Sequence, residues 1–456
     1  MALHLLKLIW NRKRANFLIV TEILLSFIVL AAVTTVAVHY YRNYQSPLGF
    51  SYERVWDIVV RVPRGLDSTP EVERQRLQQM VRLVEAVRQM PEVEAVSHSQ
   101  LPTYRNWEWS SDIRIKGGKR IDFNGNHGGD ELADAMSIAM VDGRWFSRED
   151  GGQSWDAVVI NKAMAEDIFG QARAVGQVIP VEPDTRQSAA RGEPDRPRRV
   201  VGVMEDFRQF GEYATPGNYL FERNDIVTAA AEPAPAPSAG AQNAGDTATA
   251  AATAAAAGGG TSSRPDTAQE PNRVRAELPG VIILRAQPGV TAAFEERLVK
   301  TLQGLAPDWS FAMQPIEDVR AGYLRSNYLT PLAIMGLVAG FLLVMVTLGL
   351  SGVLWQNVTQ RIRELGLRRA KGADRARIRR QIFLELALMT AIAIAGGALL
   401  LAQVPVLGWL GPVPASVYAL SLLLAAAGLF VLTSFCGWYP SLLATRIPPA
   451  EALRYE

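Results

Sequence analysis

The 456-residue sequence predicts a membrane α-helical protein with four transmembrane helices and a large extracytoplasmic α/β domain of two lobes between helices 1 and 2. The first observation is that residues 326–360 and 386–445 carry no charged side chain. About 20 apolar helical residues cross the hydrocarbon core of a bilayer, so the first run holds one crossing. The second run holds two, because prolines and glycines interrupt its middle: Pro405, Gly408, Gly411, Pro412 and Pro414.

The second observation is the basic segment between these runs. Residues 356–380 carry nine Lys or Arg and two acidic side chains. Short loops rich in Lys and Arg stay on the cytoplasmic side of a membrane. This segment is therefore expected to be a cytoplasmic loop that joins two membrane helices.

The amino-terminal helix is expected at 17–39. Basic residues precede an apolar run over 17–38 whose one charge is Glu22. A cleaved signal peptide is the alternative, but the run is about twice the length of a signal core and lacks a small-x-small cleavage site. Within 1–16, Leu3, Leu6 and Trp10 share one helical face, which favours an amphipathic helix on the inner membrane surface over a frayed terminus.

The expected topology places both termini in the cytoplasm; the family resemblance described below implies the inner membrane of a bacterium. The helices are expected at 17–39, 328–355, 381–403 and 415–438. The remaining segments are a periplasmic domain at 42–325, a cytoplasmic loop at 356–380, a short periplasmic loop at 404–414 and a cytoplasmic tail at 439–456.

The periplasmic domain has two β-α-β patterns, one at each end. The first has strands at 55–62 and 93–97 around a helix at 69–90, with Pro70 as a helix-start signal. The second has strands at 281–285 and 309–314 around a helix at 291–305. We expect these two units to form one lobe, with the intervening chain inserted as a second lobe. Its clearest elements are expected at 157–160, 162–169 and 199–204.

The stretch 228–270 differs in composition from the rest of the domain. Its 228–263 part consists mainly of Ala, Pro, Gly, Ser and Thr, with Glu232 and Asp246 as its charges. Such a chain cannot bury enough apolar surface to offset its ordering entropy. We expect a disordered insert with no chemistry of its own.

A search for catalytic motifs returns no phosphate-binding loop, no HExxH, no GxSxG and no CxxC pattern. The sequence predicts no catalytic residue, no metal site, no bound cofactor and no nucleic-acid partner. Glu108, Asp112, Asp130 and Glu131 could form a carboxylate cluster, but solvated loop charges are the simpler interpretation. The one cysteine, Cys436, is expected to be a small buried side chain in the last membrane helix.

The predicted membrane segments also contain two carboxylates and several regularly spaced glycines. Glu22 and Glu385 are interpreted as structurally paired carboxylates near the cytoplasmic side rather than as a proton path. Small residues let membrane helices approach closely, so the second helix is expected to contact another helix, and through it a partner subunit. The residues of this candidate helix-contact or dimer interface are Gly336, Gly340, Gly349 and Gly352.

The basic loop and the tail resemble those of MacB/FtsX-type ABC transporter permeases. The resemblance is carried by QRIRELGLRRAKGA at 360–373, QIFLE at 381–385 and PPAEALRYE at 448–456. Segments at 90–96, 142–146, 159–163 and 200–203 resemble a MacB-like periplasmic domain, in the same order. The resemblance covers nearly the whole chain apart from the insert.

The resemblance implies a permease that works as a dimer, with the same or a homologous chain as partner, and that a separate ATPase drives. The ATPase binds ATP-Mg and docks on the cytoplasmic loop between helices 2 and 3. In this sequence Ile362, Leu365 and Arg369 share a helical face, and Asp374 is placed to cap the next helix. The docking residues are expected to be Arg361, Ile362, Glu364, Leu365, Gly366, Arg369, Gly372 and Asp374.

A MacB protein carries its ATPase at the amino terminus, whereas only a dozen or so residues precede the first helix here, so the ATPase is expected in trans. Three functions follow from the resemblance. The favoured one is export by mechanotransmission, with a periplasmic adaptor and an outer-membrane channel as further partners. The alternatives are a lipoprotein-release permease and an FtsX-like signalling relay that controls a cell-wall hydrolase.

Overall fold

The chain divides into a helical unit, drawn from Met1–Gln45 and Arg325–Glu456, and an external unit, Ser46–Leu324. A computed structural model describes residues 13–63, 69–115, 117–181, 196–231, 276–290, 292–360, 374–408 and 413–446. The expected amphipathic segment at 1–12 lies outside these residues, as do the motif at 361–373 and the tail from 447 onward.

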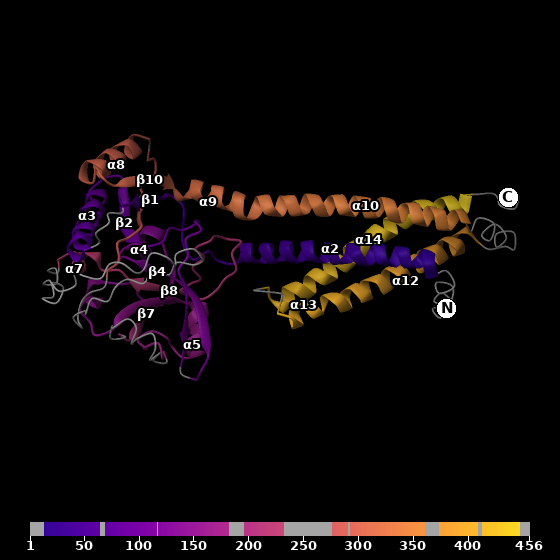
Figure 1. Cartoon of the computed structure of the whole chain (residues 1–456), viewed down its shortest axis with the longest axis horizontal. Coiled ribbons are helices and arrows are strands. Elements are labelled where there is room, and N and C mark those ends of the chain that lie inside the picture. The colour runs from indigo at the N-terminus through magenta and orange to yellow at the C-terminus, as the bar shows by residue number, and fades with distance from the viewer. Residues whose placement is uncertain are drawn as a thin grey trace, which may run out of the picture. The chain divides into compact units, whose positions relative to one another are not determined.

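The helical unit contains four long helices that run alongside one another (Figure 1). They are α2 (Lys13–Gln45), α10 (Thr330–Gln360), α12 (Arg375–Leu401) and α14 (Ala415–Arg446), with the short α13 (Gln403–Val406) after α12. In the described part of the chain, four helices are long and apolar enough to cross a membrane. The predicted fold class, with an α/β domain between the first and second of these helices, is confirmed. The helices extend past the expected bounds, and α2 continues six residues beyond 39.

The two ends of the external unit form the expected β-α-β patterns. These consist of β1 (Val55–Arg61), α3 (Pro70–Arg88) and β2 (Val93–Ser99), and of β9 (Val281–Ala286), α8 (Ala292–Leu305) and β10 (Ser310–Pro315). These four strands lie in the order β10-β1-β9-β2, and all neighbours are antiparallel. The strands of the two β-α-β patterns therefore alternate in the sheet, as in split βαβ motifs. Thr69 caps α3 by accepting a hydrogen bond from the Val72 amide at 3.3 Å, and Pro70 follows at the first helical position.

The intervening chain adds further strands. They are β3 (Ser110–Arg114), β4 (Arg120–Gly128), β5 (Met140–Gly143), β6 (Asp156–Asn161), β7 (Arg198–Met204) and β8 (Tyr219–Arg223). Its helical elements are α4 (Leu132–Met136), η1 (Arg148–Asp150) and α5 (Lys162–Phe169). The second lobe continues the first lobe's sheet in the order β2-β4-β8-β6-β7-β5. One residue pair, Ser99 with Gly128, joins β2 to β4, so the two lobes share a single sheet that is narrowest at this point.

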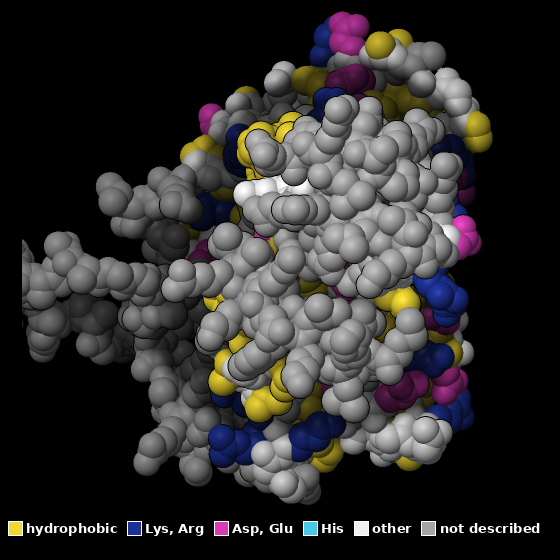
Figure 2. All heavy atoms as spheres, turned by 90° about the vertical axis from the view of Figure 1, so that its right-hand side faces the viewer, with side chains coloured by type: hydrophobic (Ala, Val, Ile, Leu, Met, Phe, Trp, Pro, Cys, Tyr) yellow, Lys and Arg dark blue, Asp and Glu magenta, His cyan; other side chains and the backbone are white. Residues whose placement is uncertain are grey.

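Two apolar clusters cover opposite faces of the shared sheet, and a third fills the inserted lobe. Below α3 and α8, Met80, Leu83 and Leu298 pack against Ile58 and Ile282 of the strands. The opposite face holds aromatic side chains from both lobes, and α5 packs on β6 and β7 through Met164. On the face in Figure 2, basic and acidic side chains lie beside one another, in keeping with the many ion pairs of the external unit.

The expected insert begins later than its composition indicates. Ile226–Ala231 form α7, in which Ala230 is buried against the α3 side of the sheet. The Thr228 hydroxyl and amide both donate to Asp225, at 2.8 and 3.0 Å. These local hydrogen bonds and the burial of Ala230 hold residues 228–231 in a helix, against the expectation. Residues 232–270 of the expected insert lie outside the described residues.

Candidate functional site

The core of the helical unit brings all four long helices together. Ile23 and Phe27 of α2, Leu350 of α10, Ala393 of α12 and Leu429 of α14 are all buried in one cluster. Close contacts at glycines hold the helices near one another, since a Cβ added at Gly397 would lie 2.6 Å from Phe27 Cδ1. Cys436 is buried in this cluster, as the sequence predicts.

The four glycines of the second membrane helix lie in two different environments. A Cβ added at Gly349 would come within 2.2 Å of Glu22 Oε1, so this glycine is in contact with α2 of the same chain. Added Cβ atoms at Gly336, Gly340 and Gly352 would meet no described atom within 4 Å. Three of the four positions therefore have free space within this chain.

The two carboxylates of the membrane segments have partners close in the sequence or in the bundle. Glu22 packs on Gly349, and its backbone carbonyl accepts a hydrogen bond from Ser26 Oγ at 2.5 Å. Glu385 is 9% exposed and accepts a hydrogen bond from Gln381 Nε2 at 3.1 Å. The Glu385 contact agrees with a structural interpretation of that carboxylate. The loop arginines Arg361, Arg363, Arg368 and Arg369 lie outside the described residues.

Most of the expected docking residues lie outside the described part of the chain, which resumes at Asp374. Asp374 occupies the N-cap position of α12, and its backbone carbonyl accepts a hydrogen bond from the Arg377 amide at 3.1 Å. Its side chain makes no capping hydrogen bond with the described residues of the helix. The position is thus as expected, whereas the capping hydrogen bond is absent.

The two connections between the external sheet and the membrane helices start from neighbouring strands. Nine residues, 46–54, separate α2 from β1, and α9 (Ile316–Leu324) follows β10 directly. A π-helical turn, η2 (Arg325–Leu329), then leads from α9 into α10. The start of β1 pairs with the end of β10, with Trp56 opposite Pro315. The Arg54 amide also donates to Glu317 Oε1 at 3.3 Å, so the two connections are in contact at the sheet edge.

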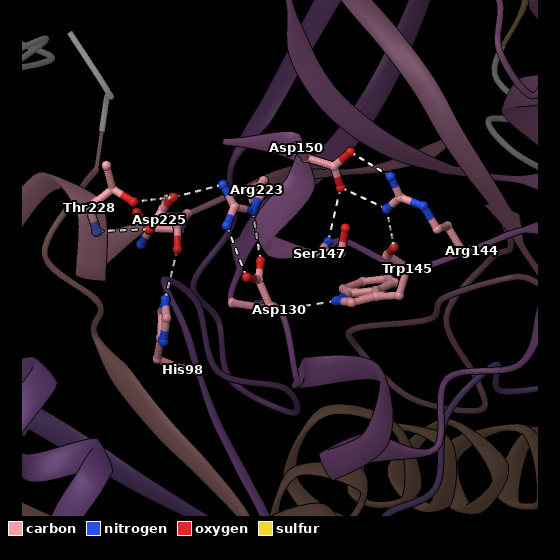
Figure 3. Close-up of polar contacts among 11 residues, drawn as sticks. His98, Asp130, Arg144, Trp145, Ser147, Asp150, Arg223, Asp225 and Thr228 are labelled. Carbon is pink, nitrogen blue, oxygen red and sulfur yellow. Dashed lines mark hydrogen bonds and ion pairs between the residues drawn. The ribbon is translucent and has the colours of Figure 1, made fainter. Parts of the chain in front are cut away.

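A buried ion-pair network lies beside the narrow junction of the two lobes (Figure 3). Arg223, whose side chain is 8% exposed, contacts Asp130 at 2.7 and 2.9 Å and Asp225 at 2.7 Å. Burial acts to raise the pKa of Asp225. Hydrogen bonds from Thr228 and the charge of Arg223 outweigh this effect and hold that pKa below its ordinary value. This network ties the end of β8 to the loop after β4.

His98 of β2 extends the junction toward the first lobe (Figure 3). Its Nε2 atom lies 3.0 Å from the carbonyl oxygen of Asn224, and a Cβ added at Gly129 would lie 2.6 Å from its ring. The Trp145 indole donates to the carbonyl of Gly129 at 3.1 Å. Burial is the main cause that lowers the pKa of His98, so the imidazole is neutral in the folded domain at neutral pH.

The four loop carboxylates Glu108, Asp112, Asp130 and Glu131 do not form one cluster in the structure. Three of them have an arginine partner each: Asp112 with Arg120, Asp130 with Arg223, and Glu131 with Arg88. The junction residues Arg223, His98 and Asn224 were not singled out from the sequence. Charged residues at the end of an apolar strand, as Glu222 and Arg223 are after Tyr219–Phe221, are the signal that could have identified Arg223.

The comparisons with known proteins agree with this architecture. A family model described as "MacB-like periplasmic core domain" matches residues 17–301, and one described as "FtsX-like permease C-terminal" matches residues 336–449. Together they cover the external unit up to α8 and the three carboxy-terminal membrane helices.

Relatives of known sequence are ABC transporter proteins. The uncharacterized ABC transporter permease YvrN of Bacillus subtilis is 25% identical over 342 residues, which are 72% of this chain and 69% of YvrN. The macrolide export ATP-binding/permease protein MacB of Rhodopirellula baltica is 34% identical over 133 residues, which are 27% of this chain. That match spans 18% of the MacB protein's own length.

A solved structure with similar elements is the periplasmic region of MacB from Actinobacillus actinomycetemcomitans. It is 14% identical, with a TM-score of 0.32 over 60% of this chain and 94% of that one, which is too low to establish the fold by itself. The match of the periplasmic core model to residues 17–301 covers more than half of the sequence. The chain therefore belongs to the family of MacB/FtsX-type ABC transporter permeases.

Proposed function

We propose that this chain is the permease subunit of a MacB-type ABC transporter, which couples ATP hydrolysis by a separate ATPase to a conformational change of its external domain. In this proposal the chain performs no hydrolysis itself. ATP-Mg is bound by the partner ATPase, which docks on the loop with Glu364, Leu365 and Gly366. A second permease chain, the same or homologous, completes the complex.

The observation that supports this proposal best is the shared origin of the two connections. Both membrane helices continue from the same end of one strand pair, β1 and β10, where Trp56 lies opposite Pro315. A displacement of α2 relative to α10 would act directly on two hydrogen-bonded strands of the sheet. Interiors are close-packed and transmit such strain instead of absorbing it. A mechanical relay is the use to which this arrangement is suited.

Export is the direction that the relatives favour, since several of them are named macrolide export ATP-binding/permease proteins. We propose a location in the bacterial inner membrane, with both termini cytoplasmic and the external unit periplasmic. An adaptor and an outer-membrane channel would then carry the substrate onward. Lipoprotein release and a signalling relay are the alternatives, and gene neighbours distinguish them: an adaptor accompanies a pump, a lipoprotein carrier accompanies release, and a hydrolase accompanies signalling.

Co-purification tests the coupling role. The full chain, tagged and co-expressed with the ABC ATPases encoded beside it, should retain an ATPase in a stoichiometric complex. Glu364→Lys and Leu365→Asp should each abolish this retention, because they reverse a charge and expose a carboxylate on the docking face. The measurement is the ATPase-to-permease ratio after affinity and size-exclusion chromatography.

The matched control is Glu166→Lys, an equal charge reversal at an exposed position of α5 in the external unit. This variant should retain the ATPase as the unmodified chain does. If no ATPase is retained, or if the loop variants retain as much as the control does, the proposed function is wrong. A companion permease in the same complex would identify the second chain.

A further inference from the structure

The loop between β7 and β8, residues 205–218, belongs to the inserted lobe. Asn161 of β6 anchors both of its ends, since Asn161 Nδ2 donates to Asp206 Oδ1 at 3.3 Å and to the Gly217 carbonyl at 2.8 Å. Phe207 is buried between aromatic rings, 4.9 Å from the centroid of Phe50 and 4.8 Å from that of Tyr219. The loop is therefore firmly attached to the body of this lobe.

This loop also holds the first membrane connection. Arg208 is 3% exposed, and its Nη1 donates to the Ser46 carbonyl at 2.9 Å, one residue after the end of α2. The Arg208 amide donates to the Leu48 carbonyl at 3.1 Å. Gly49, with φ of +88°, lies so close that an added Cβ would overlap the Asp206 carbonyl oxygen. No side chain other than hydrogen fits there.

The same loop holds the second connection. Glu212 Oε1 lies 2.5 Å from Nε of Arg320, which belongs to α9, the helix before η2 and α10. The Arg320 guanidinium stacks over the Tyr52 ring at 4.4 Å, and Tyr52 is part of the first connection. A Cβ added at Gly211 would lie 3.2 Å from Leu324 Cδ2 at the end of α9.

The ion pair is mostly shielded from water, with side-chain exposures of 24% for Arg320 and 10% for Glu212. Burial by itself lowers the pKa of Arg320, but the hydrogen bond and charge of Glu212 outweigh it and leave that pKa above its ordinary value. A second group on Arg208, Nη2, donates to the carbonyls of Glu212 and Ala214. The Arg208 contact with the first connection and the Glu212 contact with the second are therefore linked through residues 208–214.

We propose that the β7–β8 loop is the coupling element of the external domain, with Arg208, Glu212 and Arg320 as its positioning residues. It joins both membrane connections to the inserted lobe, so a relative displacement of α2 and α10 moves that lobe against the first one. The narrow Ser99–Gly128 junction between β2 and β4 is where the two lobes can yield. This inference rests on the proposed function, since it needs an ATP-driven movement to transmit.

The test measures a distance inside the external domain of the full chain in complex with its ATPase. In a Cys436→Ala background, spin labels go on Ala172→Cys, after α5 in the inserted lobe, and Ala293→Cys, on α8 of the first lobe, both exposed positions. Pulsed electron–electron double resonance then measures the distance between the two labels in the nucleotide-free complex and in the complex trapped by ATP and vanadate. The unmodified coupling loop should give a shift of the label distance between the two states.

Two variants should lose most of that shift while they still bind the ATPase. Arg208→Lys keeps the charge but cannot reach the Ser46 and Ala214 carbonyls together, and Arg320→Met removes the partner of Glu212. Arg320→Lys keeps the charge and should retain part of the shift. It also keeps the test valid should the methionine variant fail to fold.

A matched control removes a buried carboxylate that contacts neither connection. Asp150, with its side chain 1% exposed, accepts hydrogen bonds from both Arg144 Nη atoms at 2.7 Å, so Asp150→Asn costs stability without touching the loop (Figure 3). The control should keep the shift.

Three results would overturn the inference in distinguishable ways. A full shift in the Arg208→Lys and Arg320→Met variants would overturn the coupling loop and leave the proposed function intact. Loss of the shift in the Asp150→Asn control to the same degree would show that stability, and not the loop contacts, sets it. If the label distance in the chain with the unmodified loop is the same with and without ATP and vanadate, both the proposed function and the inference are wrong.

Discussion

Asn224 fastens the backbone of Glu277 with both functional groups of its side-chain amide. Its Nδ2 donates to the Glu277 carbonyl at 2.9 Å, and its Oδ1 accepts from the Glu277 amide at 3.1 Å. Asn224 precedes α7, and Glu277 comes just after the residues 232–275 that lie outside the described part of the chain. The chain on either side of that segment is thus held together without its participation.

Replacement of residues 232–275 by a short Gly-Ser linker should leave the external domain folded. The composition of this segment predicts disorder, and a shorter disordered loop has a lower entropic cost of closure. On that expectation the replacement should stabilise the domain by about 1–2 kcal/mol. Thermal unfolding of the full chain in detergent provides the measurement. A control, Asn224→Ala, should destabilise by about 1–3 kcal/mol because it removes both hydrogen bonds that the buried Asn224 side chain makes with the Glu277 backbone. A deletion that unfolds the domain would show that the segment is structural.

Gly349→Ala should lower the thermal stability of the membrane bundle. The added methyl group would come within 2.2 Å of Glu22 Oε1, so the half-buried Glu22 side chain has to turn away from α10. Overpacking costs about 1–3 kcal/mol, and we expect the lower end here because this side chain is flexible. The matched control is Gly352→Ala, less than one turn further along α10, where no described atom lies within 4 Å. Equal melting temperatures for the two variants would contradict the contact with α2.

Gly336→Leu combined with Gly340→Leu should leave the chain folded but weaken its association with a second permease. Neither glycine meets a described atom of its own chain, and the neighbouring Leu337 and Phe341 are 73% and 62% exposed. Leucines there would prevent a close approach of a partner helix. Mass photometry in nanodiscs measures the dimer fraction, with Val338→Leu as the control. An unchanged dimer fraction would exclude this face from the interface.

The junction of the two lobes should loosen as the pH falls. Burial lowers the pKa of His98 in the folded domain, whereas the unfolded chain has the ordinary value of about 6.5. The unfolded state then binds more protons below about pH 6.5, so the stabilisation is complete above that pH and is lost progressively as the pH falls from there through the lower pKa of the folded state. The charges of nearby Asp130 and Asp225 act to raise the pKa of His98, whereas the charge of Arg88 acts to lower it further.

Amide hydrogen exchange of β2 and β4 in the full chain checks this prediction. Protection of these strands, corrected for intrinsic exchange, should fall between about pH 7.5 and about pH 5.5. His98→Gln, which cannot titrate, should show a much smaller change over the same interval. An identical loss in the variant would assign the effect to other groups.

The elements that could be predicted from the sequence are those that local patterns specify. Both β9, which is an almost continuous apolar run, and α5, which starts after the Asn161 cap and ends at Gly170, lie within one residue of their expected bounds. β4 was missed because its sequence RIDFNGNHG is polar and contains glycine. Its stability comes instead from pairing with β3, the strand just before it, and with β8, far away in the sequence.

The proposed coupling residues could not be predicted for a similar reason. Arg208 and Glu212 resemble solvated loop charges in the sequence, and each is buried only because its partner lies more than 100 residues away, at Ser46 and Arg320. Of the four glycines predicted as places of close approach, Gly349 contacts α2, and sequence spacing alone could not separate it from the other three. That separation depends on which face of α10 meets α2.

The pairing of Trp56 with Pro315 also has an evolutionary consequence. Because the external domain starts and ends on adjacent strands, it behaves as a cassette whose two ends meet, and domains of this kind can be inserted into or removed from a host chain with little disturbance. Exchange at the 45/46 and 324/325 boundaries would give a related permease a new external module. The membrane helices and the external module can therefore diversify separately within one lineage.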